Sequence, residues 1–373
     1  MEYDIGCVIE WKGSVEMSKC NLLVLFGGVS PEHEVSLRSA ESILSNLDQT
    51  KYRVFPVGIT KAGQWLYFAS QDYSLLPAET WMNAPGCKPA VLSPAHDGGL
   101  LIMDGSSVQR EKIDVVFPVL HGENGEDGSV QGLAQLANLP CVGPNVAASA
   151  TSMDKCLTKL VADHAGVRQA AWELVTAQEL TDGGEQAAKR VEARFSYPVF
   201  VKPAGTGSSV GVSKVRSRQE LLSALQCAAK YDKKILVEEF IDGREVEVAV
   251  LGNDKPVASI CGEIDSGVEF YDYDAKYITD TAQLYIPARI PEPASEEVRR
   301  VAVKIYSALG CSGLSRVDFF VTRKDNQVIF NEINTLPGFT SISMYPKLFA
   351  ASGIPYSELL DRLIELAREA RNG

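Results

Sequence analysis

Several features common in other classes of protein are scarce or absent in this 373-residue sequence. The eight cysteines include no CxxC pair, and the four histidines show no spacing typical of metal ligands, so structural zinc is not expected. There is no apolar run long enough to cross a bilayer and no signal peptide. These absences, with scattered thiols, argue against a disulfide-stapled or membrane protein and favour a reducing cytosol.

Basic residues are also fewer than acidic residues in this sequence. The chain has 36 Lys and Arg against 48 Asp and Glu, a net charge of −12, and no Lys/Arg-rich run. Nucleic acid and anionic membranes are therefore not expected as partners, although single lysines can still bind a small anion. The 45% hydrophobic and 23% charged composition is typical of folded proteins, and the length predicts two or three domains.

Two neighbouring strands near the C-terminus carry charged residues. Because side chains alternate along a strand, Arg316 and Asp318 share one face of RVDFF, and Glu332 and Asn334 share one face of NEIN. The intervening TRKDNQ predicts a hairpin centred near Asp325, which puts Asp318 opposite Glu332 and Arg316 opposite Asn334. Three oxygen-bearing side chains on one face would suit Mg²⁺; a solvated face with ion pairs is the simpler alternative.

A glycine-rich segment, AGTGSSVGVSKV, follows Lys202. Glycine lets the backbone approach a ligand so that N–H groups face phosphate oxygens, and the lysine adds a positive charge. The spacing matches neither the dinucleotide-binding fingerprint nor the Walker motif, which occurs nowhere in the chain. A phosphate-binding loop and an ordinary hairpin connection are equally open here.

Two further candidates lie in the N-terminal part of the chain. His121 follows the strand VVFPVL, so we expect it at the carboxyl edge of a sheet, where ligands usually bind. Glu32 is expected at the second position of the first helix, after Ser30 as N-cap and Pro31 as first helical residue. An acidic residue at that place is favoured by the helix dipole alone, so neither residue identifies a function.

Eight short motifs taken together resemble those of the D-alanine:D-alanine ligases, which belong to the ATP-grasp superfamily. They are GGVSPEHEVSL (27–37), HGENGEDGSVQG (121–132), MDK (153–155), KPAGTGSSVGVSKV (202–215), EEFIDGREVEV (238–248), YDYDAKY (271–277), RVDFF (316–320) and NEINTLPGFTS (331–341). Each motif is modest, but eight in the family's order are specific. The resemblance runs from about residue 20 to 370.

The fold class implied by the resemblance is α/β and multidomain, an ATP-grasp fold preceded by an open α/β N-terminal domain. The implied parts are an extension of unknown role (1–16), an N-terminal α/β substrate domain (17–152), a central ATP-grasp subdomain with the glycine-rich loop (153–245) and a C-terminal ATP-grasp subdomain with the metal and substrate site (246–373).

The resemblance also implies roles for individual residues. ATP would be bound by Lys155, Lys202, Ser209, Glu238, Glu239, Ile241, Glu245 and Lys276. Two Mg²⁺ ions, which Mn²⁺ could replace, would be held by Asp318, Glu332 and Asn334. The amino-acid substrates would be bound by Glu32, His121, Arg316, Ser343 and Met344. The catalytic set would be Glu32, Ser208, Tyr277, Arg316 and Gly338, the first three hydrogen-bonded together and the last two stabilising an oxyanion.

The implied activity is the ATP-dependent ligation of two D-alanine molecules through an acyl phosphate, with release of ADP and phosphate, for peptidoglycan precursor synthesis in the bacterial cytoplasm. A related ligase that uses D-lactate or D-serine second is the alternative; ester-forming relatives often carry Phe where this chain has Tyr277. A nucleotide-binding module without catalysis is disfavoured by the retained lysines and metal ligands. The expected partners are the substrates D-alanine and ATP. The resemblance also allows a homodimer.

Overall fold

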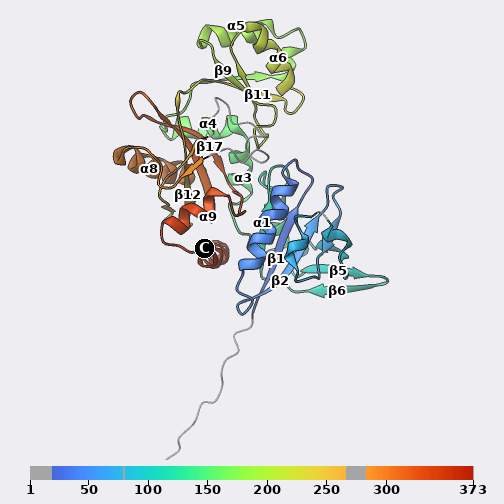
Figure 1. The fold of residues 1–373 in the computed structure, drawn as a ribbon. Helices are drawn as coiled ribbons and strands as arrows, with labels where there is room; N and C mark the ends of the chain where they lie inside the picture. Colours follow the sequence, from blue (N-terminus) through green and yellow to red (C-terminus); the bar gives the residue numbers. More distant parts are fainter. Residues whose placement is uncertain (1–18, 79, 266–282, 373) are drawn as a thin grey trace, which may run out of the picture.

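The residues that the structure describes form three β-sheets (Figure 1). The structure is a computed structural model that describes residues 19–78, 80–265 and 283–372. The extension 1–16 and the segment that carries Lys276 and Tyr277 lie outside the described residues. No helix within the described ranges is long and apolar enough to cross a membrane.

The N-terminal sheet has seven strands in the order β6-β5-β4-β3-β2-β1-β7. They are β1 (Cys20–Gly27), β2 (Tyr52–Ile59), β3 (Trp65–Tyr67), β4 (Lys88–Leu92), β5 (Leu100–Asp104), β6 (Ser107–Glu111) and β7 (Val115–Leu120). Strand β1 is buried and pairs in parallel with β2 and β7. The antiparallel strands β3, β5 and β6 were not predicted from the sequence.

Strand β1 is buried on both faces because its residues are apolar at every position from Leu22 to Phe26. Leu22, Val24 and Phe26 pack in one core with α1 (His33–Asn46). Leu23 and Leu25 pack in another core with α2 (Ser129–Leu136). Helices on opposite faces leave the carboxyl ends of β1 and β7 open at one edge, which is where ligands bind in sheets of this kind.

Helix α1 begins two residues later than predicted. Ser30 Oγ accepts a hydrogen bond from the Glu32 N–H (3.1 Å), and Ser30 O accepts one from the His33 N–H (3.2 Å), so residues 30–33 form a turn. Glu32 is therefore the N-cap and not the second helical residue. The prediction was wrong because the Ser30 side chain is used by the turn before the helix, and the shift leaves the Glu32 carboxylate free to point away from α1.

The central sheet has four antiparallel strands in the order β10-β9-β11-β8. They are β8 (Trp172–Thr176), β9 (Val199–Pro203), β10 (Ser213–Val215) and β11 (Lys234–Glu239). Helices α5 (Glu185–Arg194) and α6 (Arg218–Ala228) cover one face with an apolar core. The predicted glycine-rich loop connects β9 to β10.

The third sheet has the order β15-β14-β12-β16-β17, with β13 paired to β12. Its strands are β12 (Gly243–Leu251), β13 (Val257–Ala258), β14 (Gly262–Asp265), β15 (Gln283–Tyr285), β16 (Leu314–Thr322) and β17 (Val328–Asn334). The predicted hairpin register is confirmed: Asp318 pairs with Glu332, and Arg316 pairs with Asn334. A bulge follows at Asp318/Phe319.

The remaining helices join the sheets to one another. They are α3 (Val146–Met153), α4 (Lys155–His164), α8 (Glu292–Ala308), α9 (Met344–Ala351) and α10 (Tyr356–Asn372), with 3-10 turns η1 (Tyr73–Leu75), η2 (Trp81–Asn83) and η3 (Ala177–Leu180). Residues of α9 and α10 share one apolar core with β1 and α1, so the third sheet is docked against the N-terminal sheet. Residues from α3 and α4 pack in the core of the third sheet beside α8.

Candidate active site

Two adjoining cavities lie where the three sheets meet. The larger has a volume of about 910 Å³ and the smaller about 490 Å³. Both are lined by the same six residues at their boundary: Lys155, Thr206, Gly207, Ser208, Asn331 and Glu332. The glycine-rich loop and the strand that carries Glu332 thus form a common wall between two binding spaces.

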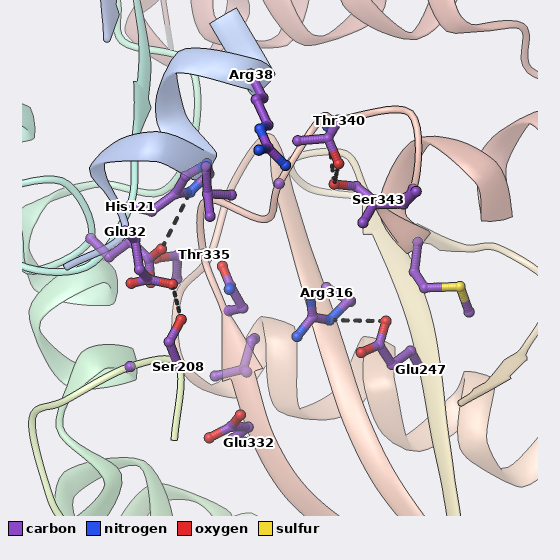
Figure 2. A pocket seen from close by; sticks show the side chains of 18 of the residues that line it. Glu32, Arg38, His121, Ser208, Glu247, Arg316, Glu332, Thr335, Thr340 and Ser343 are labelled. Carbon is purple, nitrogen blue, oxygen red and sulfur yellow. Dashed lines mark hydrogen bonds and ion pairs between the residues drawn. The ribbon is translucent and has the colours of Figure 1, made fainter. Parts of the chain in front are cut away.

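Glu32 and Ser208 connect the N-terminal sheet to the glycine-rich loop inside the larger cavity (Figure 2). Ser208 Oγ donates a hydrogen bond to Glu32 Oε1 across 176 residues of sequence. Two glycines make room for this contact, because a Cβ at Gly122 or Gly207 would lie 2.8 or 3.1 Å from Glu32 Oε2. Two of the three residues of the predicted hydrogen-bonded triad are therefore in contact; the third, Tyr277, is outside the described residues.

The loop holds two serines in an unusual backbone conformation. Ser208 and Ser209 have φ values of 50° and 59°, in the left-handed region that non-glycine residues rarely occupy. Such conformations carry local strain and are found most often at functional sites, where surrounding contacts impose them. Here the contact between Ser208 and Glu32 is one such constraint.

His121 lies at the end of β7, as predicted, and is almost fully buried. Its Nδ1 lies 2.9 Å from Leu336 O and 3.8 Å from Glu126 Oε1, and its Nε2 lies 3.4 Å from Ser39 Oγ. Burial alone would lower the pKa of His121, but the Glu126 and Glu32 carboxylates outweigh it and raise the pKa. The cavity therefore holds an imidazole biased towards its positive form, close to Glu32.

Arg316 lies on the cavity wall between two acidic residues. Its Nε and Nη2 donate to the two carboxylate oxygens of Asp318 at 2.8 and 2.7 Å, and Nε lies 3.2 Å from Glu247 Oε2. Burial would lower the pKa of the guanidinium, but the two carboxylates raise it, so Arg316 is held as a fixed positive charge. Figure 2 shows the pair with Glu247 at the edge of the cavity.

The three predicted metal ligands are neighbours on one hairpin, but only two of them line a cavity. Glu332 and Asn334 line the larger cavity, whereas Asp318 does not, and both Asp318 oxygens bind Arg316. Each carboxylate oxygen accepts two hydrogen bonds or ligands, so Asp318 retains one coordination position per oxygen. A set of two carboxylates and one amide oxygen on one face suits Mg²⁺, and these residues therefore fit the ion.

The start of α9 presents polar groups to the larger cavity. Ser343 is the N-cap of α9 and Met344 is its first residue. Ser343 Oγ accepts from the Thr340 N–H at 3.0 Å and lies 2.8 Å from Thr340 Oγ1 (Figure 2). A Cβ at Gly338 would lie 2.7 Å from Ser343 Oγ, so a larger residue there would displace the Ser343 hydroxyl. A helix N-terminus with open N–H groups is suited to a carboxylate.

Basic and acidic residues line the smaller cavity. Lys202 Nζ lies 2.6 Å from Glu238 Oε2 and 3.5 Å from Asn331 Oδ1. Lys155 Nζ donates to Thr206 O at 2.7 Å and lies 3.8 Å from Glu332. The other predicted ATP-binding residues among those described also line this cavity: Ser209, Glu239, Ile241 and Glu245. Of these, Glu239 Oε1 is occupied by the Ala171 N–H at 2.8 Å.

The charged residues near the site that the sequence analysis missed include Glu247, Lys159 and Glu126. Glu247 lies two residues after Glu245 on β12, so the alternation that identified Arg316 and Asp318 would have found it. Lys159 lies one helical turn after Lys155 and ion-pairs with Glu238. Glu126 lies in the glycine-rich stretch after β7, and no local pattern separates it from a surface residue.

Comparison with known proteins finds relatives that match almost the whole chain. A family model described as the D-ala D-ala ligase N-terminus matches residues 21–144, and one described as the D-ala D-ala ligase C-terminus matches residues 161–365. A D-alanine--D-alanine ligase of Acetivibrio thermocellus is 50% identical over 95% of this chain and 97% of its own length.

Two solved structures have the same overall fold. The VanG D-Ala:D-Ser ligase from Enterococcus faecalis is 39% identical, with a TM-score of 0.85 over 94% of this chain and 100% of that one. The D-alanine-D-alanine ligase from Coxiella burnetii is 37% identical, with a TM-score of 0.82 over 95% and 96% of the two chains. With both family models matched in order and half of the residues shared with a curated relative, this chain belongs to the D-alanine–D-alanine ligase family.

Proposed function

We propose that this chain joins two molecules of D-alanine into D-alanyl-D-alanine, using ATP and releasing ADP and phosphate. The observation that carries the proposal is the common wall of the two cavities. A ligase must bring the γ-phosphate of ATP next to a substrate carboxylate, and the six shared residues lie where the nucleotide space meets the amino-acid space. Such a product is a building block of peptidoglycan, which agrees with a bacterial cytoplasmic enzyme.

The first step activates a carboxylate, which by itself is a poor electrophile. The carboxylate of the first D-alanine attacks the γ-phosphate of ATP and forms an acyl phosphate with release of ADP. Lys155 and Lys202 would offset the charge of the phosphates, and Asp318, Glu332 and Asn334 would hold Mg²⁺, which supplies further positive charge when bound. Glu32 would bind the ammonium group of this D-alanine beside His121.

The second step forms the amide bond. The amine of the second D-alanine attacks the acyl phosphate, and the negative oxygen of the tetrahedral intermediate would lie against Arg316 and the Gly338 N–H. The carboxylate of this second D-alanine would bind Ser343 and the N–H groups at the start of α9. Collapse of the intermediate releases phosphate and the dipeptide.

D-Serine is the second candidate for the acceptor, because a D-Ala:D-Ser ligase has the same fold as this chain with 39% identity. We favour D-alanine because the curated relatives, at up to 50% identity, carry the D-alanine–D-alanine name. Tyr277, where ester-forming relatives often carry Phe, favours an amine acceptor over D-lactate.

A competition assay tests the proposal. Purified protein would receive ATP, Mg²⁺ and D-alanine with an equal concentration of D-serine or D-lactate, and the products would be separated by mass. The expected result is D-alanyl-D-alanine as main product in every mixture, with one phosphate released per dipeptide. Predominance of D-alanyl-D-serine or D-alanyl-D-lactate, or phosphate release without any ligated product, would refute it.

A further inference from the structure

A buried lysine lies behind the smaller cavity, called the nucleotide cavity below because we propose that ATP binds there, and it has no role in the chemistry described so far. Lys159 lies on α4, its side chain is 2% exposed, and it lines neither cavity among the described residues. A fully buried lysine is rare and needs a negative partner, because transfer of its charge out of water is costly. The partner is Glu238, also buried, at 2.5 Å from Nζ to Oε1.

Glu238 bridges two lysines, one at each oxygen. Lys159 contacts Oε1, and Lys202 contacts Oε2 at 2.6 Å. The two lysines differ in exposure, since the Lys202 side chain is 15% exposed and lines the nucleotide cavity. The three groups therefore carry a net charge of +1, and Lys202 is the one that presents this charge to the cavity.

Local structure fixes this arrangement. Lys202 on β9 pairs with Leu236 on β11, so Lys202 and Glu238 lie on one face of the central sheet, two residues apart in register. Cys156 of α4 packs against Leu236 and Ala204 on that face. Lys159 follows Lys155 by four residues, on the same side of α4. Helix α4 therefore places Lys155 against the glycine-rich loop and Lys159 against Glu238.

A second contact holds Lys159 in place. Its Nζ lies 3.5 Å from Gln169 Oε1, and Gln169 Nε2 donates to Lys159 O at 2.8 Å and to Asp163 Oδ1 at 2.6 Å. Gln169 also forms a β-bridge with Phe330 on β17. The lysine is therefore tied to the strand that carries Glu332 as well as to the central sheet.

Without Lys159, Glu238 and Lys202 would form a neutral pair. The carboxylate would compete with the phosphates of a nucleotide for the Lys202 ammonium, because both are anions at hydrogen-bond distance. With Lys159 present, one carboxylate oxygen of Glu238 is already paired with a positive charge that does not line the cavity. We propose that Lys159 is a positioning residue: it neutralises Glu238, so that Lys202 offers its positive charge to the phosphates of ATP. This inference rests on the proposed use of ATP.

The test measures ATP affinity by calorimetry, with Mg²⁺ and without D-alanine. Lys159→Met keeps the volume and removes the charge, so we expect ATP to bind about 10- to 100-fold more weakly. The KM for D-alanine should change less than threefold, and Lys159→Arg should recover most of the affinity. Lys304→Met, at an exposed lysine of α8 near the end of α4, is the control and should bind ATP like the wild type.

A double variant separates this role from a merely structural one. In Lys159→Met/Glu238→Gln the carboxylate that competes with ATP for Lys202 is gone, so ATP affinity should rise at least threefold above that of Lys159→Met. If Lys159→Met does not fold, the double variant is compared with Glu238→Gln alone, and we expect ATP affinities within threefold. Wild-type ATP affinity in Lys159→Met, or a double variant weaker than both single variants, would overturn the inference alone. A wild-type chain that does not bind ATP would overturn the proposed function as well.

Discussion

Arg316 illustrates how much of the site depends on single contacts between side chains. Its guanidinium is held by two hydrogen bonds to Asp318 and by the Glu247 carboxylate at 3.2 Å. A positive charge fixed before the reaction stabilises a developing oxyanion better than one that must reorient. Glu247 is therefore expected to matter for catalysis although it is assigned no contact with substrate.

Replacing Glu247 by Gln should lower kcat about 10- to 100-fold with little change in the KM for ATP, because Arg316 loses a partner while Lys155 and Lys202, which we propose bind phosphate, keep theirs. The measurement is steady-state kinetics with each substrate varied in turn. Glu173→Gln is the control: Glu173 pairs with Arg190 and Arg194 on α5, and this variant should keep its kcat. An unchanged kcat in Glu247→Gln would show that Asp318 alone positions Arg316.

A second prediction about a single residue concerns Lys202. Its side chain lines the smaller cavity, where we propose that ATP binds, so Lys202→Ala should raise the KM for ATP much more than the KM for D-alanine. Equal effects on both constants, with ATP binding unchanged by calorimetry, would contradict the assignment of this lysine to phosphate.

The hairpin of β16 and β17 is the element that the sequence predicted best. Side-chain alternation and the turn residues near Asp325 were enough to place Asp318 opposite Glu332, and the structure has that register. The start of α1 was predicted less well, because the choice between Ser30 and Glu32 as N-cap depends on a turn that competes for the Ser30 hydroxyl. Contacts such as that of Glu32 with Ser208 join different sheets, so no local pattern encodes them.

The hairpin carries the proposed metal site, so Glu332→Gln should abolish most ligation while the fold is kept. Loss of one anionic oxygen ligand should lower kcat by about 10² to 10⁴. Because Glu332 is part-exposed, its replacement should leave the far-ultraviolet circular dichroism spectrum and the unfolding midpoint close to wild type. Wild-type turnover with unchanged Mg²⁺ dependence would refute the metal assignment.

Glu238 on the central sheet forms ion pairs with Lys159 of α4 and with Lys202, and these pairs should make the free energy of unfolding depend on pH. Burial alone would raise the pKa of Glu238, but Lys202 and Lys159 outweigh it and lower the pKa from 4.5 to about 2. The ionised carboxylate therefore stabilises the folded state above pH 4.5, and this contribution is lost as the pH falls towards 2. Urea unfolding from pH 7 to pH 3 should show a steeper loss of stability in the wild type than in Glu238→Gln; parallel curves would contradict it.

At the scale of the whole molecule, the site exists because three sheets meet. The N-terminal part of the chain supplies Glu32 at the start of α1 and His121 after β7, the central sheet supplies Lys202 and the glycine-rich loop, and the third sheet supplies Arg316 and the acidic hairpin. The common core of β1, α1, α9 and α10 holds two of these sheets together. The eight motifs predicted an α/β multidomain fold from the sequence, but the two adjoining cavities became evident only in three dimensions.

The central claim is that the carboxylate of one D-alanine is activated by transfer of the γ-phosphate of ATP. Isotope transfer tests it most directly: D-alanine labelled with ¹⁸O in both carboxylate oxygens is incubated with the protein, ATP and Mg²⁺, and the released phosphate is analysed by mass spectrometry. An acyl phosphate predicts one ¹⁸O atom in each phosphate and the other in the amide carbonyl of the dipeptide. Unlabelled phosphate would contradict the account, because ATP would then have been cleaved by water.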